Sequence, residues 1–109
     1  MTTRQWFFLA LSIVGLVATW TFNLQFMRET GGFDLAAFVQ AGYANSAAAS
    51  LSNDLLTGCV AFLVFSYFES RRIGLRHWWI FPVLTFGIAF AFAFPLFLFL
   101  RERRLAQAA

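Results

Sequence analysis

Three long apolar runs, separated by short polar segments, account for most of this chain of 109 residues. The runs are Trp6–Met27, Leu55–Phe68 and Trp78–Leu100. A transmembrane helix needs about 20 predominantly apolar residues, and the outer two runs are long enough. The middle run is shorter, so we extend its helix slightly at both ends. The pattern therefore predicts an all-α integral membrane protein with three transmembrane helices, at about 6–27, 53–69 and 78–100.

The segment between the first two runs is too short and too polar to span a membrane. Within it, Leu35, Phe38 and Val39 share one face of a short helix that Asp34 can cap. We predict an interfacial helix at about 34–43, lying on the membrane surface. Between the second and third runs, Gly74 is a natural helix stop. The chain is then a single membrane domain, 1–109.

Small residues recur at helical spacing in the first and third predicted spans. The two stripes are Ser12, Gly15 and Thr19, and Gly87, Ala91 and Pro95. Such stripes let helix backbones approach closely, within one chain or between chains. Pro95 is interior and is expected to kink its helix. Trp20 is expected near the level of the headgroups.

The composition supports a membrane protein and excludes several other classes. Hydrophobic residues make up 61% of the chain and charged residues 12%, whereas a soluble domain carries about 25% charged residues. The arginines stand at the ends of apolar runs, where they anchor helices at headgroups, so no nucleic-acid partner is expected. The single cysteine, Cys59, cannot form an internal disulfide and is expected to be a packing residue. No motif indicates a catalytic site, a metal or a cofactor.

The arginine distribution does not decide the orientation of a three-span protein, whose termini lie on opposite sides. One side would carry Arg4, Arg71, Arg72 and Arg76, and the other Arg28, Arg101, Arg103 and Arg104. The positive-inside rule is then tied. We favour an inner-membrane, multi-pass protein with its N-terminus inside, because Glu29 and Asp34 dilute the charge of the first loop. The first apolar run is too long for a signal peptide and reads as an uncleaved anchor.

Two polar clusters are candidate sites. In the three-span arrangement Asn23, Asp54 and Arg101 approach the same membrane face. We consider an ion pair between Asp54 and Arg101 (or Arg103), with Asn23 as a hydrogen-bond partner. Alternatively Asp54 only caps the second span, or it handles a ligand or proton, since a charge near lipid is costly to bury.

The second cluster follows the second span and consists of Glu69, Arg71, Arg72 and Arg76. Its simplest role is to anchor and end the helix at the headgroups. The sharper hypothesis is a lipid-headgroup site, because neighbouring arginines can grip a phosphate. His77 is the only histidine and has no second ligand nearby, so the cluster does not indicate a metal site.

Several landmarks along the chain resemble those of a known family. They are Phe26–Asp34, Asn45, Asn53 with Asp54, Glu69–Gly74, Trp79 and Pro95–Glu102. Together they resemble the small bacterial membrane proteins of domain-of-unknown-function family 2834. The closing string PLFLFLRE and the connector ESRRIG carry the resemblance most specifically. The resemblance implies a bacterial inner-membrane protein and adds no activity.

The absence of a catalytic constellation favours a non-enzymatic accessory subunit or lipid-associated scaffold. Its expected partners are membrane lipids and either a second copy or an unidentified membrane protein. One alternative is a small oligomeric transporter. Such a design resembles the small multidrug exporters, but the first span of this chain lacks the acid that the first helix of those exporters carries. A second alternative is an enzyme that modifies lipids or isoprenoids with Asp54 as its acid.

Overall fold

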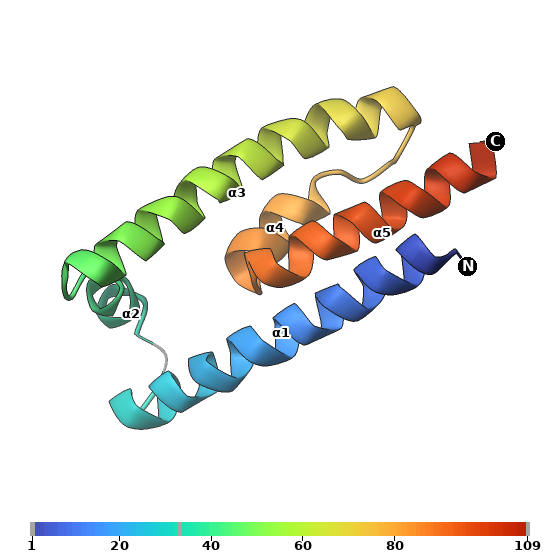
Figure 1. Ribbon diagram of the computed structural model, residues 1–109. Helices are drawn as coiled ribbons and strands as arrows, with labels where there is room; N and C mark the ends of the chain where they lie inside the picture. Colours follow the sequence, from blue (N-terminus) through green and yellow to red (C-terminus); the bar gives the residue numbers. More distant parts are fainter. Residues whose placement is uncertain (1, 33, 109) are drawn as a thin grey trace.

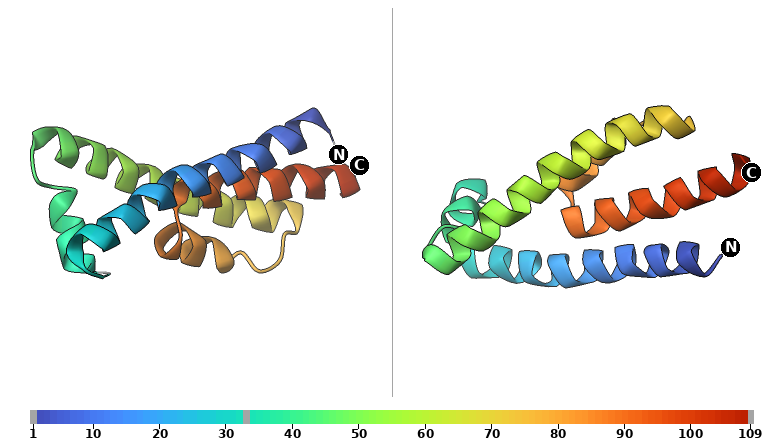
Figure 2. Two further views of the ribbon diagram at one scale, coloured as in Figure 1. Left: turned by 90° about the horizontal axis from the view of Figure 1, so that it is seen from below. Right: turned by 45° about the horizontal axis from the view of Figure 1, so that its top comes forward.

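The computed structural model describes residues 2–32 and 34–108, and these form five helices (Figure 1). The helices are α1 (Thr3–Thr30), α2 (Leu35–Ala41), α3 (Ser46–Ile73), α4 (Ile80–Gly87) and α5 (Phe90–Ala108). The predicted all-α class is confirmed. The molecule is elongated, 49 × 23 × 23 Å, and the ribbon brings both ends of the chain to one end of it (Figures 1 and 2).

The two longest helices, α1 and α3, have the dimensions of transmembrane helices. Each has 28 residues, which corresponds to about 42 Å at 1.5 Å per residue, against a hydrocarbon core of about 30 Å. In the most apolar 18-residue stretch of each helix, only 6% of α1 and 11% of α3 is buried inside the protein. The core helices of a soluble protein would instead be mostly buried. The exposed apolar faces of α1 and α3 are therefore compatible with a membrane location.

The start of α3 differs from the prediction. Asn45 caps the helix, and its Oδ1 accepts a hydrogen bond of 2.8 Å from the N–H of Ala48. The small-residue segment after Asn45 forms the first turns of α3, because alanine favours a helix. Asp54 is consequently the ninth residue of the helix, and the prediction that it caps the second span is wrong.

The predicted end of α3 at Gly74 is confirmed. Gly74 has a φ of 77°, and its N–H bonds the carbonyl of Ser70. The N–H of Leu75 bonds the same carbonyl at 2.9 Å, so the last turn is closed by a Schellman motif. The chain then runs back along the molecule to α4 (Figure 1).

The predicted third span is two helices rather than one. α4 and α5 meet in a sharp bend at Ile88 and Ala89, and both of their N–H groups bond the carbonyl of Leu84. Trp20 Nε1 donates a hydrogen bond of 2.9 Å to the Ile88 carbonyl, so the indole satisfies a group that the bend frees. Trp20 thus lies beside the bend.

The apolar part of α5, residues 90–100, is about 16 Å long, roughly half the thickness of the hydrocarbon core.

The two small-residue stripes meet at Gly15 and Ala91, where α5 packs antiparallel against the N-terminal half of α1 (Figures 1 and 2). A Cβ added to Gly15 would lie only 2.7 Å from the carbonyl carbon of Ala91, and nearer still to its oxygen. Pro95 has no N–H to bond that carbonyl within α5. Gly15 therefore makes room for a backbone group that Pro95 leaves free, and α5 continues as a helix past Pro95.

Phenylalanine rings fill the space between α3, α4 and α5. The buried cluster consists of Phe62, Phe81, Ala93 and Phe97. Phe62 of α3 stacks on Phe94 of α5 with ring centroids 4.7 Å apart. Cys59 is also buried in α3, as expected for a packing residue. The core therefore lies in the half of the molecule that holds both termini.

The opposite end of the molecule is closed by α2. The predicted cap is confirmed, because Asp34 Oδ1 accepts a 3.1 Å hydrogen bond from Ala37. The ring of Phe38 meets that of Phe26 in α1 at 5.3 Å, edge to face. Close to α2, Tyr43 donates a hydrogen bond of 2.8 Å to Asn53 of α3. This segment thus links the far ends of the two long helices.

Candidate functional site

The strongest concentration of charge lies at the end of the molecule that carries both termini. The start of α1, the end of α3 with its connector, and the end of α5 meet there (Figure 1). Arg4 Nε lies 3.9 Å from Glu102 Oε2, and Arg104 Nε donates to the Ile73 carbonyl at 2.9 Å. These contacts join all three segments into one arginine-rich end.

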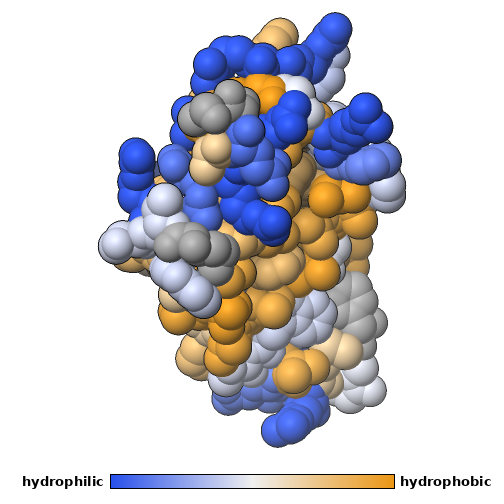
Figure 3. Space-filling view, turned by 90° about the vertical axis from the view of Figure 1, so that its right-hand side faces the viewer, coloured by the Kyte–Doolittle hydropathy of each residue, from blue (hydrophilic) through white to orange (hydrophobic). Residues whose placement is uncertain are grey.

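Seven of the eight arginines belong to this arginine-rich end: Arg4, Arg71, Arg72, Arg76, Arg101, Arg103 and Arg104. Only two carboxylates, Glu69 and Glu102, accompany them. The side chains of this end therefore carry an excess of five positive charges, whereas the remaining charged residues of the chain are Arg28 and three acids. Figure 3 shows hydrophilic side chains gathered on this end, with an apolar band below them.

Two carboxylates and three arginines form a continuous ion-pair network across the helices. Glu69 is buried and accepts a hydrogen bond from Arg72 Nε one turn later in α3. Its second oxygen lies 3.3 Å from Arg101 Nε of α5. Arg101 Nη1 also lies 3.5 Å from Glu102, the carboxylate that Arg4 approaches from α1. The network thus ties α1, α3 and α5 together.

The network differs in strength from one part to another. Arg4 is largely exposed, and a pair of this kind contributes at most about 1 kcal/mol because water and salt screen it. The Glu69–Arg101 pair is shielded on both sides, with side chains 9% and 26% exposed. Removing one partner of a shielded pair leaves the other charge poorly solvated. The Glu69–Arg101 contact is therefore the structural centre of the arginine-rich end.

The connector is bonded to α3 one turn before Glu69. Ser66, one turn earlier in α3, accepts a hydrogen bond of 2.7 Å from Trp78 Nε1 of the connector. Ser66 in turn donates to the Leu63 carbonyl at 3.0 Å. The indole of Trp78 therefore holds the connector against the inward face of α3, next to the turn that carries Glu69.

Two further arginines rest on aromatic rings. The guanidinium of Arg103 lies over Phe99, 5.7 Å from the ring centroid, and that of Arg71 lies over Tyr67 at 5.8 Å. Arg71 also donates to the Tyr67 hydroxyl at 3.0 Å. Within residues 2–32 and 34–108, neither arginine pairs with a carboxylate. Their charges remain available to a ligand.

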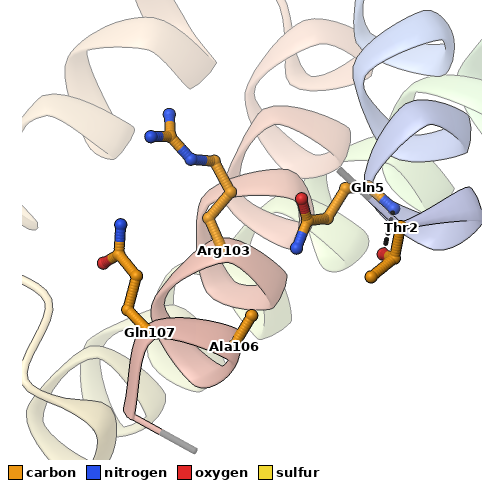
Figure 4. A pocket seen from close by; sticks show the side chains of 5 residues that line it. All are labelled: Thr2, Gln5, Arg103, Ala106 and Gln107. Carbon is orange, nitrogen blue, oxygen red and sulfur yellow. Dashed lines mark hydrogen bonds between the residues drawn. The ribbon is translucent and has the colours of Figure 1, made fainter.

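A shallow hollow of about 320 Å³ lies between the start of α1 and the end of α5 (Figure 4). Its lining residues are Thr2, Gln5, Arg103, Ala106 and Gln107. Gln5 is 5% exposed, and its Nε2 donates a long hydrogen bond of 3.5 Å to the Glu102 carbonyl. The hollow thus combines one cation with two carboxamides.

The structure does not form the predicted cluster of Asn23, Asp54 and Arg101. Arg101 contacts Glu69, and Asp54 lies fifteen residues from Glu69 on the same helix, about 22 Å away. The predicted Asp54–Arg101 pair is therefore wrong. It assumed that the third span crosses the membrane without turning back, whereas the bend at Ile88 sends α5 toward the start of α1.

The second predicted cluster is divided by the structure. Glu69 and Arg72 join the ion-pair network, Arg71 rests on Tyr67, and Arg76 is exposed in the connector. The sequence prediction missed Gln5 and the pairing of Arg4 with Glu102, because these residues are nearly 100 positions apart. In the three-span topology the arginines divide evenly between the two membrane faces. That even division was itself a signal against this topology, because the positive-inside rule expects an excess of arginine on one face.

The charges of the arginine-rich end are suited to binding an anion. Glu69 and Glu102 are both engaged by arginines, so neither is poised to exchange a proton with a substrate. Among the described residues, no group of three or more His, Cys, Asp or Glu side chains is placed to hold a metal ion. The excess of guanidinium groups favours an anionic ligand.

Comparison with known proteins identifies the family. A family model described as "Protein of unknown function DUF2834" matches residues 7–103. The chain belongs to this family. The match to DUF2834 includes the bend, all of α3 and most of α1 and α5. It also includes every member of the ion-pair network except Arg4. No curated protein and no solved structure matches the chain.

Proposed function

We propose that this DUF2834 protein is a non-catalytic, lipid-associated protein of the bacterial inner membrane. In this proposal α1 and α3 span the bilayer, and the arginine-rich end lies in the cytoplasm, where it binds anionic phospholipid headgroups. One observation carries the proposal: seven of the eight arginines belong to one end of the molecule.

The arginine distribution supports both the orientation and the ligand. Cytoplasmic segments of membrane proteins are enriched in lysine and arginine. In a three-span arrangement the arginines divide equally between the two sides of the membrane. When both termini lie at one end, that end carries seven of the eight arginines, so the positive-inside rule favours an N-terminus inside. Each basic side chain near an anionic membrane surface contributes about 1 kcal/mol of attraction. Five uncompensated charges favour anionic over zwitterionic lipid.

The lipid-associated role is better supported than the accessory-subunit role. The small-residue stripes were the main feature suited to a protein partner, and Gly15 of α1 packs on Ala91 of α5 in the same chain. An enzyme based on Asp54 has little support, since Asp54 is exposed and far from the other polar cluster. The proposal therefore does not need a second protein.

The bend between α4 and α5 is the one observation that favours the alternative of a small oligomeric transporter. Broken helices supply backbone groups to substrate sites in many transporters. Here, however, the Ile88 carbonyl is taken by Trp20. A transporter would need this hydrogen bond to open, so we rank this role second.

Native mass spectrometry of the purified protein released from nanodiscs tests the proposal. From an equimolar mixture of phosphatidylglycerol and phosphatidylcholine, we expect the protein to retain at least about fivefold more phosphatidylglycerol than phosphatidylcholine. We expect high salt to weaken this preference. Equal retention of the two lipids would refute anionic-lipid binding. A defined second protein in extracts of the host membrane would support the accessory-subunit role instead.

A further inference from the structure

The hollow between α1 and α5 offers a more specific site than the general charge of the arginine-rich end. Figure 4 shows Arg103 and Gln107 extending from α5, one helical turn apart. Both line the hollow. Gln5 reaches toward α5 from the neighbouring helix, and Thr2 lies at the rim. Four polar side chains from two helices thus border a space of about 320 Å³.

Arg103, like Arg71, lies over an aromatic ring, and of these two arginines Arg103 is the one that lines the hollow. Its guanidinium is positioned over the ring of Phe99, which is itself buried. Stacking leaves the N–H groups at the edge of the guanidinium free, and that edge matches two oxygens of a phosphate. Among the described residues Arg103 forms no ion pair, whereas Arg4, Arg72 and Arg101 are engaged by carboxylates.

Gln5 is the polar group that α1 contributes to the lining beside Arg103. The residue is 5% exposed, and in the described part of the chain its amide nitrogen makes one long hydrogen bond, to the Glu102 carbonyl. A carboxamide has two N–H donors and an acceptor oxygen. Gln5 and Gln107 therefore offer both donors and acceptors to a ligand that carries hydroxyl groups.

The start of α1 adds positive potential beside Arg103. Thr2 caps the helix by accepting from the N–H of Gln5 at 3.2 Å, while other first-turn N–H groups have no partner within the helix. A helix N-terminus favours an anion through these groups. The nearest acid, Glu102, is already paired with Arg4 and Arg101, so its charge is largely compensated.

We propose that this hollow binds a glycerophosphate group, with Arg103 on the phosphate oxygens and Gln5 and Gln107 on the glycerol hydroxyls. The proposal deepens the proposed function, on which it rests, by naming one site and one headgroup chemistry. Phosphatidylglycerol and free glycerol 3-phosphate both carry this group, and the test separates them.

The test compares matched variants of the full chain in nanodiscs that contain phosphatidylglycerol. Arg103→Ala is expected to weaken phosphatidylglycerol retention about tenfold in native mass spectrometry, which corresponds to the loss of one bidentate arginine–phosphate contact. Arg76→Ala removes the same charge from the exposed connector and is expected to change retention less than about twofold. Gln107→Ala is expected to weaken phosphatidylglycerol while leaving phosphatidic acid, which has no glycerol headgroup, unchanged.

Two outcomes would overturn the site. Equal and small losses in Arg103→Ala and Arg76→Ala would show that only net charge matters, while the proposed function would stand. An unchanged headgroup preference in Gln107→Ala would remove the role of the carboxamides. A wild-type protein that retains phosphatidylcholine equally well would instead refute the proposed function itself.

A second arm distinguishes the source of the glycerophosphate group. Free glycerol 3-phosphate is added at millimolar concentration to protein in uncharged detergent, and binding is followed by its mass. If the wild-type protein and Arg76→Ala bind free glycerol 3-phosphate and Arg103→Ala does not, the result supports the site with a soluble ligand. Retention of the lipid alone, with the same dependence on Arg103, supports the site with a membrane lipid.

Discussion

Replacing Gly15 with alanine tests the contact that brings both termini to one end. The added Cβ would lie 2.7 Å from the carbonyl carbon of Ala91, and carbon atoms pack at about 3.5 Å or more. The helices α1 and α5 would then have to separate by at least about 0.8 Å, because the Ala91 oxygen lies nearer still to the added Cβ. Overpacking of this kind costs about 1–3 kcal/mol, and the gain in helix propensity returns at most about 1 kcal/mol.

Gly87→Ala is the matched control, because nothing lies within 4 Å of a Cβ added there. We expect Gly15→Ala to lower the free energy of unfolding by about 1–2 kcal/mol, and Gly87→Ala to leave it unchanged or raise it slightly. The assay is unfolding of detergent-solubilised protein by SDS, followed by circular dichroism. Equal stability of the two variants would refute the close packing of α1 on α5.

Two more substitutions test the bend and the ion-pair network by the same assay. Trp20→Phe removes the donor to the Ile88 carbonyl, and we expect it to cost about 1–3 kcal/mol because a carbonyl is left without a partner at the bend. Glu69→Gln removes the charge that faces Arg101, and we expect a loss of about 1–3 kcal/mol.

Each of these changes has a control in the same helix. Trp6→Phe alters an exposed indole of α1, and Asp54→Asn alters an exposed acid of α3, so both should be near neutral. If Trp20→Phe is as stable as Trp6→Phe, the hydrogen bond does not support the bend. If Glu69→Gln is as stable as Asp54→Asn, the network does not hold α3 to α5.

The sequence predicted α1 and the end of α3, because apolar length and end signals are local, but it placed the start of α3 too late. Asp34 caps α2 and Gly74 ends α3 as predicted. The bend at Ile88 could not be predicted, since the apolar run continues unbroken through it and Pro95 offered a more obvious place for a kink. What stabilises the bend is a donor from Trp20, 68 positions away, and no local pattern reports such a contact.

The error in the candidate site followed from that single error in topology. An uninterrupted third span would carry Arg101 to the face of Asp54, whereas the bend returns it to Glu69. The second predicted cluster was expected to follow the second span, whereas the structure places Glu69, Arg71 and Arg72 inside α3 and Arg76 in the connector. Their partners from α1 and α5, including Arg4 and Glu102, depend on how distant segments meet.

The topology of the chain in its membrane tests the central claim most directly. Single cysteines are placed at Thr3, Gln107 and Thr30 in a Cys59→Ala background and labelled with a membrane-impermeant maleimide in intact cells and in inverted vesicles. We predict that Thr3→Cys and Gln107→Cys are labelled only in inverted vesicles, and Thr30→Cys only in intact cells. Labelling of Thr3→Cys and Gln107→Cys from opposite sides would contradict the account, because a third complete span would then separate the arginines.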